Sequence, residues 1–179
     1  MSYAIHPYGI SLTDLRRVAC DLEACMVAYS KMLDMAARHD LWIVEQDDPR
    51  LPTMRGALDL LARGRGGPGF CLAYALQLLC AAHGRFLHNA GVSGTRIRWL
   101  ETVDAALEAQ GKRFRLMNLN TPPVPLPFID DYPMVGFARR QDLAELAALP
   151  IAEDPEIEST FETLRAWAAA GTDLVTFYF

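Results

Sequence analysis

The sequence predicts an α+β fold, in which a helix-rich single domain carries a small antiparallel or mixed sheet. Apolar residues recur at helical spacing over most of the chain, while β-type segments lie near both termini and after a proline-rich loop. The helices do not alternate regularly with strands, which argues against a doubly wound sheet. A chain of 179 residues can bury one core and is short for two. We therefore predict one globular domain over residues 1–179.

The elements expected at the start of the chain follow from the spacing of apolar residues and the position of Pro7. Residues 4–8 predict a short strand, and Pro7 indicates that it lies near an edge or a strand end. Apolar residues at helical spacing over 15–36 then predict one long helix or two shorter ones, ending near Arg38.

The middle of the chain predicts three more helices. The first covers 54–62, and the second covers 70–82 after a glycine-rich turn. Because residues 70–82 are apolar on every side, we expect them to form the central helix. The third begins near Trp99 and ends at Gly111. Residues 114–117 are ambiguous between strand and helix.

The last third begins with five prolines between Thr121 and Pro133. Proline lacks a backbone donor, so this segment predicts an extended, ordered loop. Asp154 followed by Pro155 is typical of a helix start. The remaining expected elements are a strand at 134–137, short and long helices at 141–149 and 155–170, and an interior strand at 174–179.

Net charge limits the classes of partner. The chain has 17 basic and 22 acidic residues, and its net charge of −5 arises entirely after residue 90. A nucleic-acid partner is not expected, because binding one needs a basic face. A basic protein partner is permitted, although a solvated acidic helix face is the preferred explanation of the charge. No membrane span or signal peptide is recognisable, so we expect a cytoplasmic protein without membrane contact.

Cys71 is the candidate nucleophile, because the start of a helix can stabilise a thiolate. Such chemistry also needs a nearby histidine. His83 is twelve residues further along the same helix, about 18 Å away, and cannot reach Cys71. The alternative is a buried structural cysteine.

Two other groups are candidate ligand sites. Cys80, His83 and His88 could supply metal ligands, but they lack the paired spacing of structural zinc sites. We expect no metal or other cofactor. The loop Arg63–Gly69, with Arg63 and Arg65, could cradle a small anion before a helix N-terminus. It lacks the ending of a P-loop, and a plain connector is the alternative.

Asp130, Asp131 and Tyr132 end the proline-rich loop and form the candidate partner-binding site. Adjacent carboxylates can accept hydrogen bonds from a basic group, or hold a turn through bonds to their own backbone.

Several segments resemble an uncharacterised family of small bacterial cytoplasmic proteins with a domain of unknown function. The resemblance lies in Pro125-Leu126-Pro127, Asp130-Asp131-Tyr132-Pro133, Gly136-Phe137, the apolar helix Ala73–Cys80, the helix that starts at Trp99, and the aromatic strand Val175–Phe179. It implies a shared fold and a bacterial source, and no activity.

We interpret the chain as a non-catalytic binding module for a partner protein or small ligand, with an immunity-like or antitoxin-like role suggested by analogy. The alternatives are a thiol-dependent enzyme using Cys71 and an anion-binding regulatory module using the Arg63–Gly69 loop.

Overall fold

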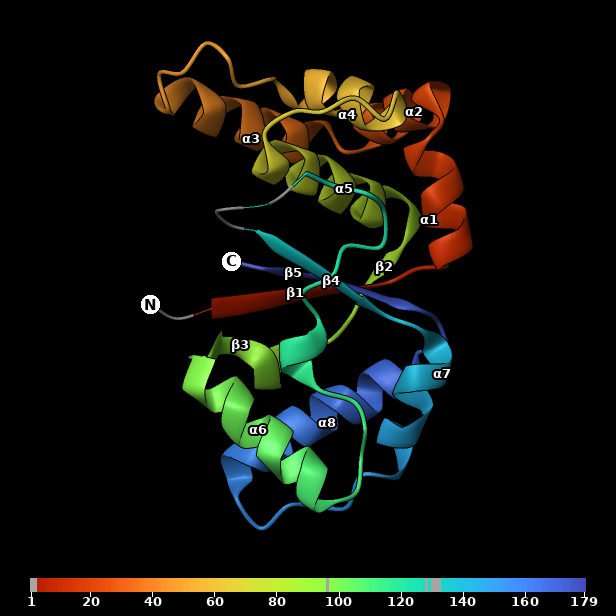
Figure 1. Cartoon of the computed structure of the whole chain (residues 1–179), viewed down its shortest axis with the longest axis vertical. Coiled ribbons are helices and arrows are strands. Elements are labelled where there is room, and N and C mark those ends of the chain that lie inside the picture. The colour runs from red at the N-terminus through yellow and green to blue at the C-terminus, as the bar shows by residue number, and fades with distance from the viewer. Residues whose placement is uncertain (1–2, 96, 128, 130–132) are drawn as a thin grey trace. The chain divides into compact units, whose positions relative to one another are not determined.

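A small sheet joins strands from the beginning, middle and end of the chain in a computed structural model, which describes residues 3–95, 97–127, 129 and 133–179 (Figure 1). The strands in this described part are β1 (Tyr3–Gly9), β2 (Arg85–Phe86), β3 (Ser93–Thr95), β4 (Met134–Ala138) and β5 (Leu174–Tyr178). Their order is β2-β1-β5-β4, and β3 also pairs with β1. The predicted α+β class is confirmed.

The chain divides into two compact units. We call one the sheet unit; it comprises the described residues of Met1–Gly9, Phe86–Thr121 and Val135–Phe179. The other, the helical unit, comprises the described residues of Ile10–Arg85 and Pro122–Met134. The prediction of one domain stays a prediction, and each unit is treated separately below.

The strands β1 and β5 form the centre of the sheet. They are antiparallel, with Ile5 opposite Tyr178 and Pro7 opposite Thr176. All five residues of β5 are buried, as expected for an interior strand. Of the two places predicted for Pro7, the sheet edge was wrong, because β1 lies between β5 and β2. Pro7 does lie near the end of its strand, two residues before Gly9.

Proline is tolerated in β1 because of its register. Ala4 and Phe179 exchange backbone hydrogen bonds of 3.0 Å in both directions. Hydrogen-bonded pairs alternate along an antiparallel ladder, so Pro7 falls at a position that needs no donor towards β5. On the other side of β1, the Pro7 carbonyl oxygen accepts from Leu87 N at 2.9 Å.

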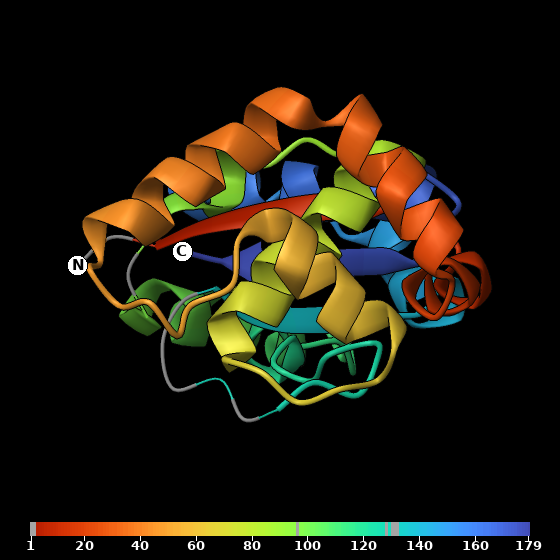
Figure 2. The same cartoon turned by 90° about the horizontal axis from the view of Figure 1, so that it is seen from above.

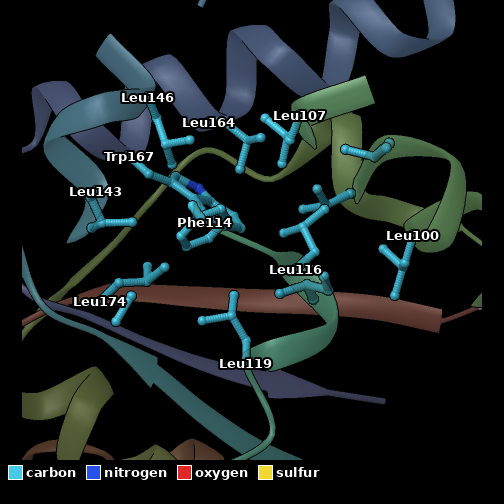
Figure 3. Packing of buried hydrophobic residues seen from close by; sticks show 14 of the residues in the cluster. Leu100, Leu107, Phe114, Leu116, Leu119, Leu143, Leu146, Leu164, Trp167 and Leu174 are labelled. Carbon is cyan, nitrogen blue, oxygen red and sulfur yellow. The ribbon is translucent and has the colours of Figure 1, made fainter. Parts of the chain in front are cut away.

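Helices cover one face of this sheet (Figure 1). They are α6 (Ile97–Ala109), α7 (Arg140–Leu143), the following 3-10 helix η3 (Ala144–Ala148) and α8 (Pro155–Ala169). Asp154 caps α8 as predicted, since its carboxylate accepts from Glu156 N at 2.8 Å. Leucines and Trp167 fill the space between helices and sheet (Figure 3). The Trp167 indole donates to the His88 carbonyl oxygen at 2.7 Å.

A buried carboxylate organises the segment that was ambiguous between strand and helix, which forms the 3-10 helix η2 (Leu116–Asn118). Asp104 accepts from Leu116 N at 2.7 Å and from Met117 N at 3.0 Å. Burial raises the pKa of Asp104, although both backbone hydrogen bonds oppose that shift. Tyr178 completes the network by donating to the Leu116 carbonyl oxygen at 2.9 Å.

Two glycines of the sheet unit permit close backbone contact. A Cβ atom on Gly91, in the 3-10 helix η1 (Ala90–Val92), would lie 2.1 Å from the carbonyl oxygen of Ser159 in α8. A Cβ on Gly136 in β4 would lie 2.0 Å from the Leu119 carbonyl oxygen. Any larger residue at either position requires the backbone to move.

The helical unit contains five helices in its described residues. They are α1 (Leu12–Ala19), α2 (Leu22–Lys31), α3 (Leu33–Glu45), α4 (Met54–Ala62) and α5 (Gly69–His83). The apolar helix α5 contacts each of the other four, which confirms its predicted central place. Figure 2 shows α3, in orange, along the outside of this unit. None of the helices in the described part of the chain is long and apolar enough to cross a bilayer.

The prediction of one or two helices ending near Arg38 was wrong, because three helices occupy this region and α3 continues to Glu45. Asp21 starts α2 by accepting from Glu23 N at 2.9 Å. Met32 starts α3 without a side-chain cap. These breaks change the helical phase, so Leu33 is 54% exposed instead of facing inward.

Candidate functional site

The outer face of α3 carries an exposed apolar stripe, formed by Leu33, Ala37, Leu41 and Val44. Their spacing places them on one side of the helix. Leu33, Leu41 and Val44 are 54%, 66% and 76% exposed, and Ala37 is also exposed. We call these four residues the α3 stripe.

The opposite side of α3 is apolar too. Ala36, His39 and Ile43 are buried there. A helix of a soluble protein normally has one apolar face and one polar face. The second apolar face of α3 is therefore not explained by packing within the helical unit.

Acidic side chains surround the α3 stripe. Residues 33–48 contain five carboxylates and one arginine, Arg38, so their formal charge is 1 − 5 = −4 with His39 neutral. The carboxylates are Asp34, Asp40, Glu45, Asp47 and Asp48.

Only part of this negative charge is neutralised within the chain. Hydrogen bonds from the Arg50 guanidinium to Asp48, one of them 2.7 Å long, lower the pKa of Asp48 to about 2. Asp34, Glu45 and Asp47 are exposed and form no ion pair with any residue that the structure describes. The stripe thus has an acidic border.

Cys71 lies at the start of α5 as predicted, but its environment is unlike that of an activated thiolate. Its side chain is fully buried. Burial raises the pKa of the thiol to about 11. Cys71 is therefore protonated near neutral pH and shielded from solvent, which weighs against the thiol-enzyme alternative.

The candidate metal ligands are not brought together within either unit. Cys80 is fully buried inside α5, whereas His83 is exposed at the end of the same helix. Partial burial of its ring, together with the charges of Lys31 and Arg17, lowers the pKa of His83. His88 is exposed in the sheet unit. Among the described residues, no group of three or more histidine, cysteine or carboxylate side chains could hold a metal.

The Arg63–Gly69 loop begins by capping α4. Gly64 adopts a left-handed conformation with φ of 59°. Gly64 N donates to the Leu61 carbonyl oxygen at 3.0 Å and Arg65 N to that of Leu60 at 2.9 Å. This is a Schellman motif, which satisfies the end of a helix.

These bonds reduce what the loop can offer an anion. The backbone donors of Gly64 and Arg65 are already engaged by α4. Arg63 is already paired with Asp59 at 2.8 Å, so its charge is partly balanced. Arg65 is exposed. The connector interpretation therefore accounts for more of the loop than the anion-binding one.

Asp130, Asp131 and Tyr132 lie outside the described residues. The part of the proline-rich loop that precedes them packs on the helical unit, with Pro123 and Val124 buried. Arg16 in α1 anchors it by donating to the Pro123 carbonyl oxygen at 2.9 Å.

The α3 stripe was missed by sequence reasoning, although a signal was present. Leu33, Leu41 and Val44 repeat at helical spacing on one side, while Ala36 and Ile43 repeat on the other. Two apolar faces on one helix near five carboxylates indicate a surface helix with a second contact, not a core helix.

The fold and the α3 stripe together define the class: an α+β protein that exposes an apolar helix face. The chain belongs to the family described as "Domain of unknown function (DUF7691)", whose model matches residues 1–179. The expectation of an uncharacterised family is confirmed. No curated protein and no solved structure matches the chain.

Proposed function

We propose that this chain is a non-catalytic binding protein that recognises a partner protein through the α3 stripe. The partner presents an apolar helical face bordered by lysine or arginine. The observation that carries this proposal is the exposure of Leu33, Leu41 and Val44 on one face of α3.

The apolar side chains provide the affinity. Fully burying a leucine or valine side chain contributes about 1.5–3 kcal/mol. Most of this free energy remains available at Leu33, Leu41 and Val44, because the chain itself covers less than half of each. Exposed apolar residues that stand singly are ordinary, whereas a contiguous set with a polar border is typical of an interaction surface.

The acidic border selects the kind of partner. A second copy of this chain would bring a formal charge of −3, counted over residues 33–50 so that Arg50 is included, against an equal charge, which opposes self-association. A basic partner would pair with Asp34, Glu45 and Asp47, which have no ion pair among the described residues. Such charges mainly accelerate association and exclude wrong partners.

A second contact remains part of the proposal. Asp130, Asp131 and Tyr132 would accept a basic group of the same partner. Replacing both carboxylates, as Asp130→Asn with Asp131→Asn, should slow association if this contact is used. An unchanged association rate would remove these residues from the proposed surface.

Model peptides can test recognition by α3. The probe is a labelled amphipathic peptide of leucine and lysine, about 18 residues or five helical turns long. A matched peptide has glutamate in place of lysine. Fluorescence anisotropy should show binding of the lysine peptide, weaker binding at high salt, and no binding of the glutamate peptide.

Two matched variants locate the surface. Leu41→Asp should weaken binding of the lysine peptide at least about tenfold, which corresponds to 1.4 kcal/mol. Ile151→Asp is the control, because Ile151 is 83% exposed but lies outside the helical unit. Equal loss in both variants would contradict the proposal. So would a homodimer, detected by light scattering, that Leu41→Asp dissociates.

A further inference from the structure

The inner side of α3 borders a cavity of about 220 Å³ within the helical unit. It is lined by Met35, Arg38, His39 and Trp42 of α3, Met54 of α4, and Tyr74 and Gln77 of α5. The cavity is separate from the α3 stripe, since none of the four stripe residues lines it.

The cavity is partly open to solvent, and its volume suits a small molecule. An engineered apolar cavity of about 150 Å³ accommodates benzene. A cavity of about 220 Å³ therefore has room for one aromatic ring with a short substituent, or for a compact bicyclic ring.

The walls favour a flat aromatic group. The rings of Trp42 and Tyr74 lie 5.6 Å apart between centroids and are tilted by 50°. Phe70 supports Trp42 from its edge, at 5.7 Å and 85°. Aromatic rings stack on one another with a specific geometry, which adds to the gain from burying apolar area.

His39 supplies a hydrogen-bond acceptor that nothing in the described chain uses. Its Nδ1 atom lies 3.4 Å from Asp40 Oδ1. The carboxylate can only accept, so we place the imidazole proton on Nδ1, which leaves Nε2 as the acceptor. Nε2 is buried and has no hydrogen-bond partner. Burial lowers the pKa of His39, which keeps the ring neutral at pH 7.

Arg38 also lines the cavity and supplies a guanidinium group there. Its Nε atom donates to the backbone oxygen of Asp34 at 3.3 Å. No carboxylate among the described residues forms an ion pair with the guanidinium. Arginine binds carboxylates in a bidentate manner, and the charge disfavours a cationic ligand.

We propose that this cavity binds a small aromatic carboxylic acid that also carries a ring N–H or O–H. The ring lies against Trp42 and Tyr74, the carboxylate pairs with Arg38, and the N–H or O–H donates to Nε2 of His39. Each of the three groups on the ligand thus contacts a different residue or pair of residues in the cavity wall.

A panel of defined compounds tests the three contacts separately. Indole-3-acetate and the 3- and 4-hydroxyphenylacetates carry both polar groups, phenylacetate lacks the ring donor, and 2-(4-hydroxyphenyl)ethanol lacks the carboxylate. Isothermal titration should show that at least one complete compound binds tenfold or more tightly than both incomplete ones. Quenching of Trp42 fluorescence, absent in Trp42→Phe, would locate the ligand.

Two variants and one spectrum provide the decisive comparison. His39→Phe should remove the preference for the ring donor, and Arg38→Met should remove the preference for the carboxylate. In ¹⁵N-histidine spectra of the unaltered protein, the Nε2 resonance of His39 should shift with ligand. Equal affinity for complete and incomplete compounds, or no binding by any of them at millimolar concentration, would overturn the proposal.

The outcome is independent of partner binding. Leu41→Asp should leave the affinity for these acids unchanged, because Leu41 is not part of the cavity wall. Loss of acid binding in Leu41→Asp would contradict a ligand site on the inner side of α3. Failure of the lysine peptide to bind would not affect the acid result.

Discussion

Replacing His39 by phenylalanine should stabilise the protein at neutral pH, although His39 is a buried residue in contact with two other rings. Phenylalanine also carries a flat aromatic ring, one atom larger than imidazole, and can keep the ring contacts that His39 makes with Tyr74 at 5.1 Å and Trp42 at 5.9 Å. It removes the buried Nε2 atom that has no hydrogen-bond partner.

The expected gain follows from that unpaired atom. Leaving a buried acceptor unsatisfied costs about 1–3 kcal/mol, and replacing it by an apolar group of the same shape is neutral or favourable. The 3.4 Å contact between His39 and Asp40 is long, so its loss subtracts little. The 2.6 Å hydrogen bond from Met54 N to Asp40 does not involve the imidazole, so the substitution leaves that acceptor engaged. We expect a net gain of about 1 kcal/mol, or roughly 2–4 °C in Tm.

Acidic pH should increase the difference between the two proteins. Burial depresses the folded-state pKa of His39 below its ordinary value of 6.5. Below pH 6.5 the unfolded chain therefore binds a proton that the folded chain does not, and stability falls as the pH decreases towards the folded-state pKa. The slope cannot exceed about 1.4 kcal/mol per pH unit, so this residue costs at most about 2 kcal/mol between pH 6.5 and 5.

Urea unfolding at pH 7.5, 6.5, 5.5 and 5 measures both effects. The pKa values of His6 and His83 are also lowered, mainly by burial, so the unaltered protein alone does not isolate His39. The difference in unfolding free energy between the unaltered protein and His39→Phe does isolate His39. If His39→Phe loses more than about 1 kcal/mol at pH 7.5 with unchanged pH dependence, the buried Nε2 is satisfied and the reasoning fails.

Three further predictions concern other parts of the chain. Gly91→Ala should lower the free energy of unfolding by about 3 kcal/mol or more, because the new Cβ meets the backbone of α8 at 2.1 Å. The control Gly66→Ala should change the free energy of unfolding by less than about 1 kcal/mol, because a Cβ on Gly66 would have no atom within 4 Å. Asp104→Ala should cost about 2–5 kcal/mol in urea unfolding, since it orphans two backbone N–H groups; a loss below about 1 kcal/mol would mean that water replaces the carboxylate. Iodoacetamide at pH 7.5 should label exposed Cys20 and leave Cys71 unlabelled until denaturant is added, and rapid native labelling of Cys71 would revive the thiol-enzyme alternative.

Local signals in the sequence predicted most of the fold. Asp154 with Pro155 marks the start of α8, and the positive φ of Gly111 follows the end of α6. These signals act within one helical turn and need no tertiary contact. The start of α3 at Met32 has no side-chain cap, so the sequence contained no comparable mark for it.

The α3 stripe and the cavity depend on contacts between helices, which cannot be read from the sequence pattern. Which apolar face of α3 stays exposed is decided by the neighbouring helices, and the cavity joins Trp42 to Tyr74 from separate helices. At Cys71, a helix N-terminus lowers a thiol pKa while burial raises it. The helix N-terminus can be recognised in the sequence, whereas the burial of Cys71 cannot. Burial has the larger effect on the pKa of this thiol.

The pairing of β1 with β5 has a consequence for the order of folding during synthesis. The first and last described strands are neighbours, so β1 gains this partner only after residues 174–178 have left the ribosome. The helices α1–α5, in contrast, are continuous in sequence and contact one another locally. Contacts between distant segments form slowly because a long loop must close first. The helices α1–α5 can therefore assemble early, while the sheet unit completes its structure last.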